Sequence, residues 1–332
     1  GSYALRMVVM VRGRKEEFVL PTEHMADAKS LARKLASLGR IHVADQKGTQ
    51  LFMSTFMARL MQRKEAIDTY RQMGWHNNFK SFLLGDVLFT RNEEHKVVVA
   101  KLVSEKLAGA WEARGDKQEW IDAVDQLYNR EHAEPYQFAV CAAFAAPLHA
   151  ILGRIYPEWK GIPFALTSED SGYAKTTINK IACSIWLNPE RAIVSQSTPK
   201  AVLGVVSAFN NVPFVLDEVT QYLAKPDELA ELLYALSNGQ PREGMTAGGQ
   251  LRERLPSWCG VIPMTGNRKL LQLVTENKLN PEAVQMRVFE IDLDLYPRIA
   301  TMDKTTEEFR EHGERLGEIA KALPGQCHGV IG

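Results

Sequence analysis

The apolar and polar positions divide the chain into regions with different periods. The first region reads as two strands joined by a Gly-Arg-Lys turn, a helix ending in glycine, a short strand, a second helix and a return to strand-like sequence. These segments lie at 3–13, 16–24, 25–39, 40–45, 49–67 and 74–90. They predict a mixed α/β region over 3–100. The helix at 49–67 groups Leu51, Phe52, Phe56, Leu60 and Met61 on one face, which is typical of a helix that packs on a core.

A helical pattern follows over about 101–157 and is clearest at 119–129 and 135–156. The second of these segments is apolar nearly all round, which is typical of a buried helix. Pro147 interrupts it, and the chain has no run of about 18 apolar residues. We therefore expect no membrane span.

Strands and helices alternate from Ile162 onward. This pattern predicts a parallel sheet covered by helices. The expected strands lie at 162–167, 191–196, 212–220, 259–267 and 287–293, and the expected helices at 175–187, 199–211 and 227–239. We interpret Gly1-Ser2 as a cloning remnant on a piece of a longer protein. The predicted parts are this remnant (1–2), a mixed α/β domain (3–100), a helical connecting segment (101–157), an α/β core (158–302) and a C-terminal helix and tail (303–332).

Composition narrows the classes of function. The chain of 332 residues has zero formal net charge, so overall charge does not indicate a nucleic-acid binder and any such surface is local. The four cysteines are scattered without a CxxC pair, which argues against a zinc knuckle. Cys141 and Cys183 fall in apolar helical stretches, and we expect them to be buried free thiols in a reducing compartment.

The stretch "SEDSGYAKTT" at 168–177 lies between an expected strand and an expected helix. It is close to the phosphate-loop pattern G-x-x-x-x-G-K-[ST], with Glu169 at the first glycine position and Ala174 before Lys175. Backbone N–H groups at such a helix start favour phosphate, Lys175 can reach the outer phosphates, and the Thr176 hydroxyl can hold Mg²⁺. The alternative is a Ser/Gly-rich helix start in a packed domain. The candidate nucleotide-binding residues are Ser171, Gly172, Tyr173, Ala174, Lys175, Thr176 and Thr177.

Two further expected strands end in polar residues. "VPFVLDEVT" ends with Asp217, which can support Mg²⁺, and Glu218, which can act as a general base on water. Successive strand residues point to opposite faces, so we expect the two carboxylates to take different roles. "GVIPMTGN" ends with Asn267, which can orient the water or sense the γ-phosphate. A helix cap after the first strand and a Gly-Asn turn after the second are the alternatives.

Arginines supply two more candidates. Arg287 stands just before the last expected strand and can reach a neighbouring subunit's nucleotide as an arginine finger, although a structural ion pair is the alternative. The polar segment 237–258 carries Arg242, Arg252 and Arg254, which can contact DNA phosphates or a subunit interface. These three and Arg268 are the other candidates for the finger.

The order of these features resembles the additional-strand class of P-loop ATPases, which includes AAA+ proteins and superfamily 3 helicases. More narrowly, the chain resembles the phage and plasmid ATPases of the family called domain of unknown function 927. The stretches that carry this resemblance are "GWHNNF", "SGYAKTT", "SQSTPKAV", "LDEV", "LYALSNGQPREG", "WCGVIPMTGN" and "MRVFEI". The family usually has Gly-Lys-Thr where this chain has Ala174-Lys175-Thr176, and this departure bears on the rate of ATP hydrolysis more than on the fold.

The resemblance implies a cytoplasmic, ATP- and Mg²⁺-dependent motor. Its expected form is a ring-forming, hexameric DNA helicase or translocase of phage or plasmid replication, acting on single-stranded or forked DNA. Family members are often linked to primase-type domains, and superfamily 3 helicases place a pore hairpin in the interval that corresponds to 237–258. Two alternatives remain open: a nucleotide-gated DNA-binding or assembly protein with weak hydrolysis, and a packaging or defence ATPase on the same core.

Overall fold

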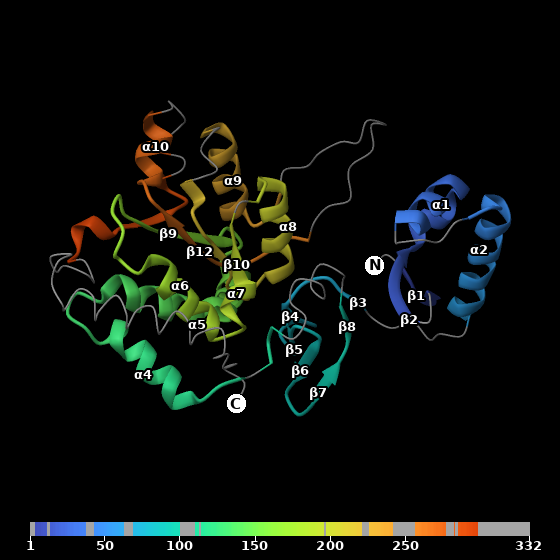
Figure 1. Ribbon diagram of the computed structural model, residues 1–332, viewed down its shortest axis with the longest axis horizontal. Helices are drawn as coiled ribbons and strands as arrows, with labels where there is room; N and C mark the ends of the chain where they lie inside the picture. Colours follow the sequence, from blue (N-terminus) through green and yellow to red (C-terminus); the bar gives the residue numbers. More distant parts are fainter. Residues whose placement is uncertain are drawn as a thin grey trace. The chain divides into compact units, whose positions relative to one another are not determined.

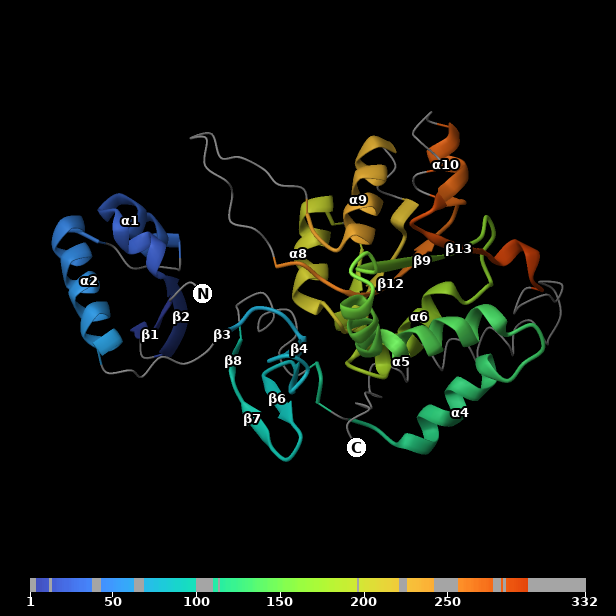
Figure 2. The same cartoon turned by 180° about the vertical axis from the view of Figure 1, so that it is seen from behind.

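The chain packs as two units. The computed structural model describes residues 4–11, 14–37, 43–62, 69–99, 110–112, 114–195, 197–220, 226–241, 256–276, 282 and 285–297. One unit is Gly1–Asp68 and the other is Thr69–Gly332, and Figures 1 and 2 show the elements of each from two sides. The division falls inside the 3–100 region that the sequence pattern grouped together.

The first unit is a hairpin with two helices. Strands β1 (Ala4–Val11) and β2 (Arg14–Pro21) pair antiparallel, and a 3-10 turn, η1 (Thr22–Ala26), leads into α1 (Ala28–Ser37) and α2 (Gln46–Gln62). Of the predicted Gly-Arg-Lys turn, Arg14 and Lys15 belong to β2, and Gly13 lies outside the described residues. The core of this unit consists of Leu5, Leu20, Met25, Leu31, Leu35, Met53 and Met57.

The apolar face predicted for α2 is not the face that enters this core. Met53 and Met57, one turn apart, are buried, and Leu60 packs beside them. In contrast, Phe52 is 65% exposed and stacks on Phe56 at the surface, with ring centroids 6.1 Å apart. Leu51 and Met61 are exposed as well. A core this small is covered by one narrow stripe of the helix. Residues 43–45 do not form the short strand predicted at 40–45, and the rest of that segment lies outside the described residues.

The second unit is built on a five-stranded parallel sheet in the order β10-β11-β12-β9-β13. This confirms the predicted mixed α/β fold with a parallel sheet. The central strand β12 is buried along its whole length and β9 along most of it, as expected for strands covered on both faces. The strands are β9 (Gly161–Thr167), β10 (Ile193–Val194), β11 (Val215–Leu216), β12 (Gly260–Gly266) and β13 (Phe289–Asp292).

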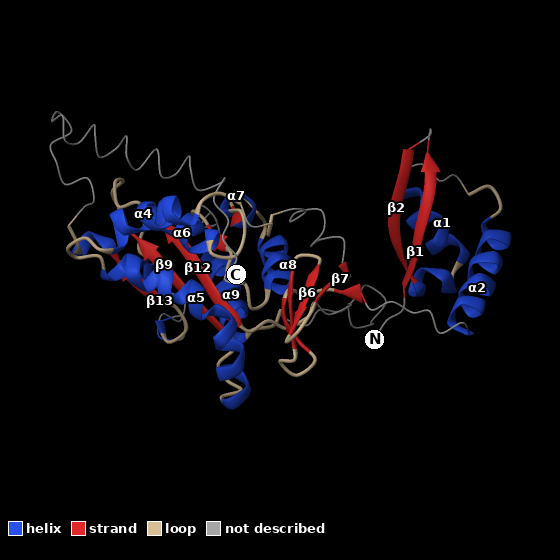
Figure 3. Cartoon of the chain, turned by 90° about the horizontal axis from the view of Figure 1, so that it is seen from below, coloured by secondary structure: helices blue, strands red, loops and turns tan. Residues whose placement is uncertain are grey.

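Helices cover both faces of this sheet. Helices α5 and α6 pack together and contact β12 on one face, whereas α9 packs on β9 and on α8 and α10 on the other (Figures 1 and 3). Short α7 precedes β10, and α4, capped by Asp116, packs on α5. The bounds are α4 (Lys117–Tyr128), α5 (Glu134–Ile155), α6 (Lys175–Ser184), α7 (Pro189–Ala192), α8 (Pro199–Phe209), α9 (Pro226–Asn238) and α10 (Leu270–Glu276), followed by η3 (Leu293–Leu295).

Helix α5 is half core and half surface. Among the described residues it is the one helix long and apolar enough to cross a membrane by length and composition. Tyr136, Ala139, Ala143 and Ala146 are nonetheless buried in the α/β core, whereas Leu148 is 58% exposed. The prediction that this helix is buried therefore holds for one face. Its Cys141 is exposed, contrary to the expected burial, while Cys183 in α6 is buried as predicted.

Pro147 sits inside α5 and leaves one carbonyl without its helical partner. A proline has no N–H, so the carbonyl of Ala143, four residues earlier, has no helical donor. The indole N–H of Trp186 donates to that carbonyl at 2.8 Å, and the indole of Trp75 donates to the carbonyl of Pro147 at 2.9 Å. Two tryptophans from outside the helix therefore secure it at the proline.

A small antiparallel sheet packs beside this core. It consists of β4 (Gly74–His76), β5 (Ser81–Leu84), β6 (Val87–Thr90) and β7 (Glu94–Lys96), and β3 (Thr69–Tyr70) pairs with β8 (Val98–Val99) in a separate ladder. Gly74 has a positive φ of 89° and lies against Asn211, whose side chain accepts from the N–H of Trp75 at 2.9 Å. A side chain at position 74 would meet Asn211, so glycine is required there.

Candidate functional site

The candidate site lies at the carboxyl ends of β9, β12 and β11. Strand β12 stands between the other two. The segment after β9, the carboxylates after β11 and Asn267 after β12 therefore meet at one edge of the sheet, as parallel strands require. In open α/β sheets this edge is where ligands bind.

Lys175 is the centre of this site. Its ammonium donates to the carbonyl and hydroxyl oxygens of Ser168 at 3.1 and 2.6 Å and to Oδ1 of Asn267 at 3.0 Å. The side chain is buried at 9% exposure, and this desolvation lowers the pKa of Lys175 below its usual value, although the nearby charges of Glu218, Asp294 and Asp217 oppose the shift. A buried cation next to exposed backbone is suited to an anionic group.

Asp217 is held by two hydroxyl groups. Thr176 donates to its Oδ1 at 3.2 Å and Thr265 of β12 donates to the same oxygen at 2.7 Å. The Thr265 hydroxyl also accepts from the N–H of Glu218 at 2.8 Å. The hydroxyl of Thr176 and the carboxylate of Asp217 are hard oxygen ligands of the kind Mg²⁺ prefers, together with substrate phosphates. The described residues hold no group of three or more His, Cys, Asp or Glu side chains that could bind a metal without such help.

Glu218 turns toward Asn267. The side-chain amide of Asn267 donates to both carboxylate oxygens of Glu218 at 2.7 Å. The backbone of Glu218 has a positive φ of 54°, which is unfavourable for a residue with a side chain and departs from the extended conformation predicted through 212–220. The two adjacent carboxylates take different partners, as predicted. The reason differs from the predicted one, because the strand ends at Leu216 and the chain turns there, so side-chain alternation along a strand does not apply.

The loop between β9 and α6 also contains a left-handed turn. Gly172 has a φ of 96°, and Ala174, which directly precedes α6, has φ 51° and ψ 28°. The hydroxyl of Tyr136 in α5 donates to the carbonyl of Tyr173 at 2.9 Å. Tyr173 is buried and Thr177 is partly buried, whereas Ser171 and Gly172 are exposed. The loop is thus fixed at Tyr173 and open to solvent at Ser171 and Gly172.

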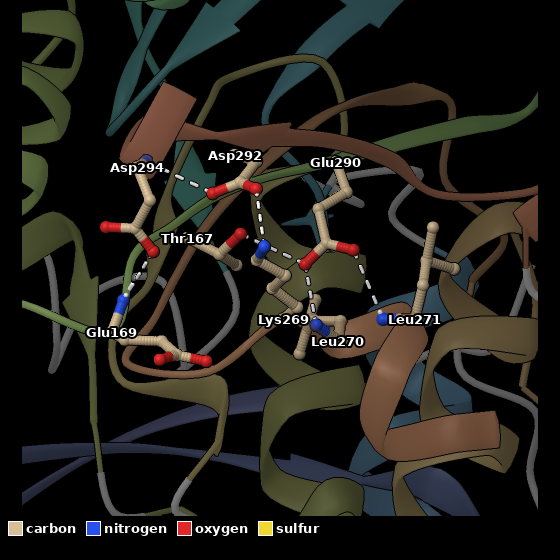
Figure 4. Close-up of polar contacts among 8 residues, drawn as sticks. All are labelled: Thr167, Glu169, Lys269, Leu270, Leu271, Glu290, Asp292 and Asp294. Atoms are coloured by element: carbon tan, nitrogen blue, oxygen red, sulfur yellow. Dashed lines mark hydrogen bonds and ion pairs between the residues drawn. The ribbon is translucent and has the colours of Figure 1, made fainter. Parts of the chain in front are cut away.

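Three carboxylates that the sequence analysis did not single out complete the surroundings of the site. They are Glu290, Asp292 and Asp294, on and just after β13, and Figure 4 shows them beside Thr167, Glu169 and Lys269. Glu290 and Asp292 alternate along β13 and so lie on one face of that strand, whereas Asp294 follows in η3. The alternate spacing of the three in "FEIDLDL" was the available signal. The sequence pattern does not report that β13 pairs with β9, so it does not show which groups these carboxylates face.

Two of the arginine candidates lie within the described residues. The guanidinium of Arg287 lies over the ring of Tyr234 in α9, 4.5 Å from its centroid, an arrangement typical of a cation–π contact. Arg268 is exposed next to Asn267. Arg242, Arg252 and Arg254 lie outside the described residues.

Comparison with known proteins places this α/β protein in a family. The family described as "Domain of unknown function (DUF927)" matches residues 4–254, and the chain belongs to it. The match includes Lys175, Asp217 and Glu218 and ends before β12 and β13. The resemblance to this family that was drawn from the sequence is therefore confirmed.

One solved structure gives a likeness in fold. It is described as "SCCmec type IV Cch - active helicase", is 17% identical and superposes with a TM-score of 0.61. The likeness covers 99% of this chain and 56% of that chain, so this chain spans little more than half the length of the helicase. No curated protein sequence matches this chain.

Proposed function

We propose that this protein is an ATP-hydrolysing motor of the P-loop additional-strand class, acting as a helicase or translocase on DNA. The observation that carries the proposal is a set of direct contacts at one edge of the sheet: Asn267 bonds both Lys175 and Glu218, and Thr176 bonds Asp217. The position of β12 between the loop strand and the acidic strand supports it. The helicase likeness in fold and the family membership agree with it.

Each of these residues takes a role in the proposed reaction. Lys175 and the backbone of 171–177 bind the phosphates of ATP, and Thr176 and Asp217 hold Mg²⁺, which supplies charge neutralisation at the phosphates when bound. Glu218 accepts a proton from the attacking water, and Asn267 orients that water or senses the γ-phosphate. Because the carboxylate of Glu218 is hydrogen-bonded to the side-chain amide of Asn267, this one amide can position both the general base and the attacking water.

The larger assembly is part of the same proposal. We propose a hexameric ring in which Arg287 acts as a finger toward a neighbouring subunit's nucleotide and Arg242, Arg252 and Arg254 contact single-stranded or forked DNA. In this proposal the collar or partner-binding domain is 3–100 and the helical connector is 101–157. The motor core is 158–302 and the tail is 303–332. The proposal includes a primase-type domain as a partner in the full-length protein, and a location in the cytoplasm of a bacterium or an infected host.

The test measures ATP binding and hydrolysis with and without single-stranded DNA. Wild-type protein should hydrolyse ATP faster with DNA, and Lys175→Ala should lose ATP binding. Glu218→Gln should bind ATP while turnover falls by about 10²–10⁴-fold, the contribution usual for a general base. Glu94→Gln, on the exposed strand β7, is the charge-matched control and should behave as wild type. Equal turnover in Glu218→Gln and wild type would reject the assigned base.

A second function is favoured by one feature of the loop. Ala174 occupies a left-handed position that glycine usually fills, and a nucleotide-gated binder tolerates a loop that hydrolyses slowly. In that case wild type binds ATP without turnover, and Glu218→Gln changes neither quantity. A packaging or defence ATPase would instead hydrolyse ATP with double-stranded DNA as the stimulating substrate.

A further inference from the structure

Strand β13 contacts both parts of the site. Glu290 accepts from the hydroxyl of Thr167 at 3.0 Å and from the N–H groups of Leu270 and Leu271 at 2.6 and 3.2 Å (Figure 4). Asp292 pairs with Lys269 at 2.7 Å. These two carboxylates therefore hold the end of β9 and the chain just after Asn267.

Asp294, the third carboxylate, contacts the loop itself. Its Oδ2 accepts from the N–H of Glu169 at 2.9 Å, at the first residue after Ser168 (Figure 4). A side-chain hydrogen bond and the charge of Asp294 also reach Tyr173, where they add to the effect of burial in raising the pKa of the phenol. Asp294 therefore spans the loop from Glu169 to Tyr173.

Two other contacts fix the loop at the ends of that span. The carbonyl of Tyr173 accepts a hydrogen bond from the hydroxyl of Tyr136, and the hydroxyl oxygen of Ser168 accepts one from the ammonium of Lys175. Asp294 is itself oriented, because its N–H donates to Oδ1 of Asp292 at 3.1 Å, and Asp292 is held by Lys269. The carboxylate is thus placed by β13 and not by the loop that it binds.

The negative charge of Asp294 allows two roles of this carboxylate to be distinguished by their opposite effects on nucleotide binding. It lies near enough to Lys175 to raise the pKa of that ammonium against the effect of burial. A carboxylate that did nothing else beside a phosphate site would repel the phosphates, and its removal would strengthen nucleotide binding. A carboxylate that shapes the loop has the opposite effect, since its removal weakens binding.

We propose that Asp294 is a positioning residue that holds loop 168–174 in its phosphate-binding shape by accepting from the Glu169 N–H. The inference rests on the proposed nucleotide function and extends it to a residue of β13's C-terminal turn. It assigns a part in ATP binding to the turn after β13, in addition to the loop and the acidic strand β11.

The test is calorimetric titration of the whole chain with ATP and Mg²⁺. Asp294→Ala should weaken ATP binding about five- to tenfold, the loss expected for hydrogen bonds to a charged acceptor at a partly solvated position. Asp294→Asn removes the same charge but keeps an acceptor oxygen, so it should bind ATP within about twofold of wild type or more tightly. Tyr173→Phe should show a smaller loss than Asp294→Ala. Glu94→Gln is again the control for loss of one negative charge.

Hydrolysis kinetics separate positioning from general damage to the fold. Asp294→Ala should raise the KM for ATP while kcat stays within about twofold, because the groups assigned to catalysis are untouched. If Asp294→Ala does not fold, ATP binding by Tyr173→Phe is compared with ATP binding by Asp294→Asn. Weaker binding by Tyr173→Phe supports the inference, and equal binding by the two variants overturns it.

Three results would overturn the inference. They are ATP binding by Asp294→Ala as tight as wild type, tighter binding by that variant, and equally weak binding by Asp294→Ala and Asp294→Asn. If wild type binds ATP and Lys175→Ala does not, such a result removes the role of Asp294 alone. If wild type binds no ATP, the proposed function fails and this inference fails with it.

Discussion

Ala174 holds a backbone conformation that suits glycine better. Its φ of 51° and ψ of 28° lie in the left-handed region, where a Cβ costs roughly 1–2 kcal/mol. The residue stands directly before Lys175, so the strain lies where the loop becomes helix. Strain of this kind persists where surrounding contacts fix the chain, and here the Tyr136–Tyr173 and Lys175–Ser168 bonds flank the position.

Ala174→Gly should therefore stabilise the protein. Relief of the left-handed strain exceeds the extra entropy of a glycine in the unfolded chain, so we expect the free energy of unfolding to rise by up to about 1 kcal/mol. Urea denaturation measures it. The matched control is Ala182→Gly inside α6, where the backbone is right-handed and the loss should be about 1 kcal/mol or more. Loss of stability in Ala174→Gly would contradict the strain.

Asn179 is a buried polar side chain without a partner. It has 0% exposure on α6, and its amide is the one among the described residues whose buried nitrogen and oxygen form no hydrogen bond. Asn179→Leu, close in size and apolar, should raise the free energy of unfolding by about 1 kcal/mol or more. Asn211→Leu is the contrast, because Asn211 binds the Trp75 N–H and the Cys259 carbonyl, and its replacement should cost about 1–3 kcal/mol. A fall in stability for both would mean that Asn179 has a role that its contacts do not show.

The residues of the site differ in how far the sequence could reveal them. Lys175, Thr176, Asp217, Glu218 and Asn267 each follow a strand or begin a helix, so element order was enough to predict that they lie together. Glu290 and Asp294 come close to the site because β13 pairs with β9. That pairing joins positions about 125 residues apart, as in the Glu169–Asp294 bond, and local pattern does not report it.

At the scale of elements, α5 depends on a donor from outside the helix. Trp186→Phe should leave the Ala143 carbonyl unpaired and lower the free energy of unfolding by about 1–3 kcal/mol, beyond any loss of packing. Pro147→Ala restores an N–H that can bond the same carbonyl. In a double-mutant cycle, Trp186→Phe should therefore cost less in the Pro147→Ala background than in wild type. Equal costs in both backgrounds would show that the indole bond contributes little.

Element type was more predictable than element extent. The nine-residue strand predicted at 212–220 is reduced to Val215–Leu216, because Asp217 and Glu218 turn toward Thr265 and Asn267. Side-chain bonds to the neighbouring strand outweigh the apolar run there. Helix α2 shows the complementary limit: its strongest apolar positions, Phe52 and Phe56, are exposed, since the core that it joins is reached through Met53 and Met57.

At the scale of the whole molecule, the buried His149 and the partly buried His76 make stability depend on pH. Burial lowers the pKa of His149 below 6.5, partly opposed by its hydrogen bond to the Lys160 carbonyl, and burial likewise lowers the pKa of His76. The unfolded chain takes up these protons near 6.5 and the folded protein only at lower pH. Stability should therefore fall as pH drops from 6.5 toward the folded pKa.

His149→Gln tests this dependence. Glutamine keeps a donor for the Lys160 carbonyl but does not titrate. Urea denaturation at about pH 7.5 and about pH 5 should show a smaller acid loss in the variant than in wild type. An unchanged difference between the two pH values would mean that His149 does not contribute to the acid sensitivity.

The division into two units was beyond the sequence pattern. Residues 3–100 read as one α/β region because strand and helix signals continue through it. Packing instead separates Gly1–Asp68 from Thr69–Gly332. Within the second unit, the Trp75 indole donates to the Pro147 carbonyl of α5 and the Met73 N–H donates to the Ala208 carbonyl of α8. The wider predicted arrangement of core and tail remains a prediction.

Under the proposed function, the side-chain amide of Asn267 would set an order of events. One end of this amide occupies both oxygens of Glu218, and the other end occupies the ammonium of Lys175. A phosphate that draws Lys175 away therefore releases one end of the amide and leaves the carboxylate able to exchange its partner for water. Arrival of the nucleotide would precede activation of water, so an empty site would have an idle base and a loaded site a ready one.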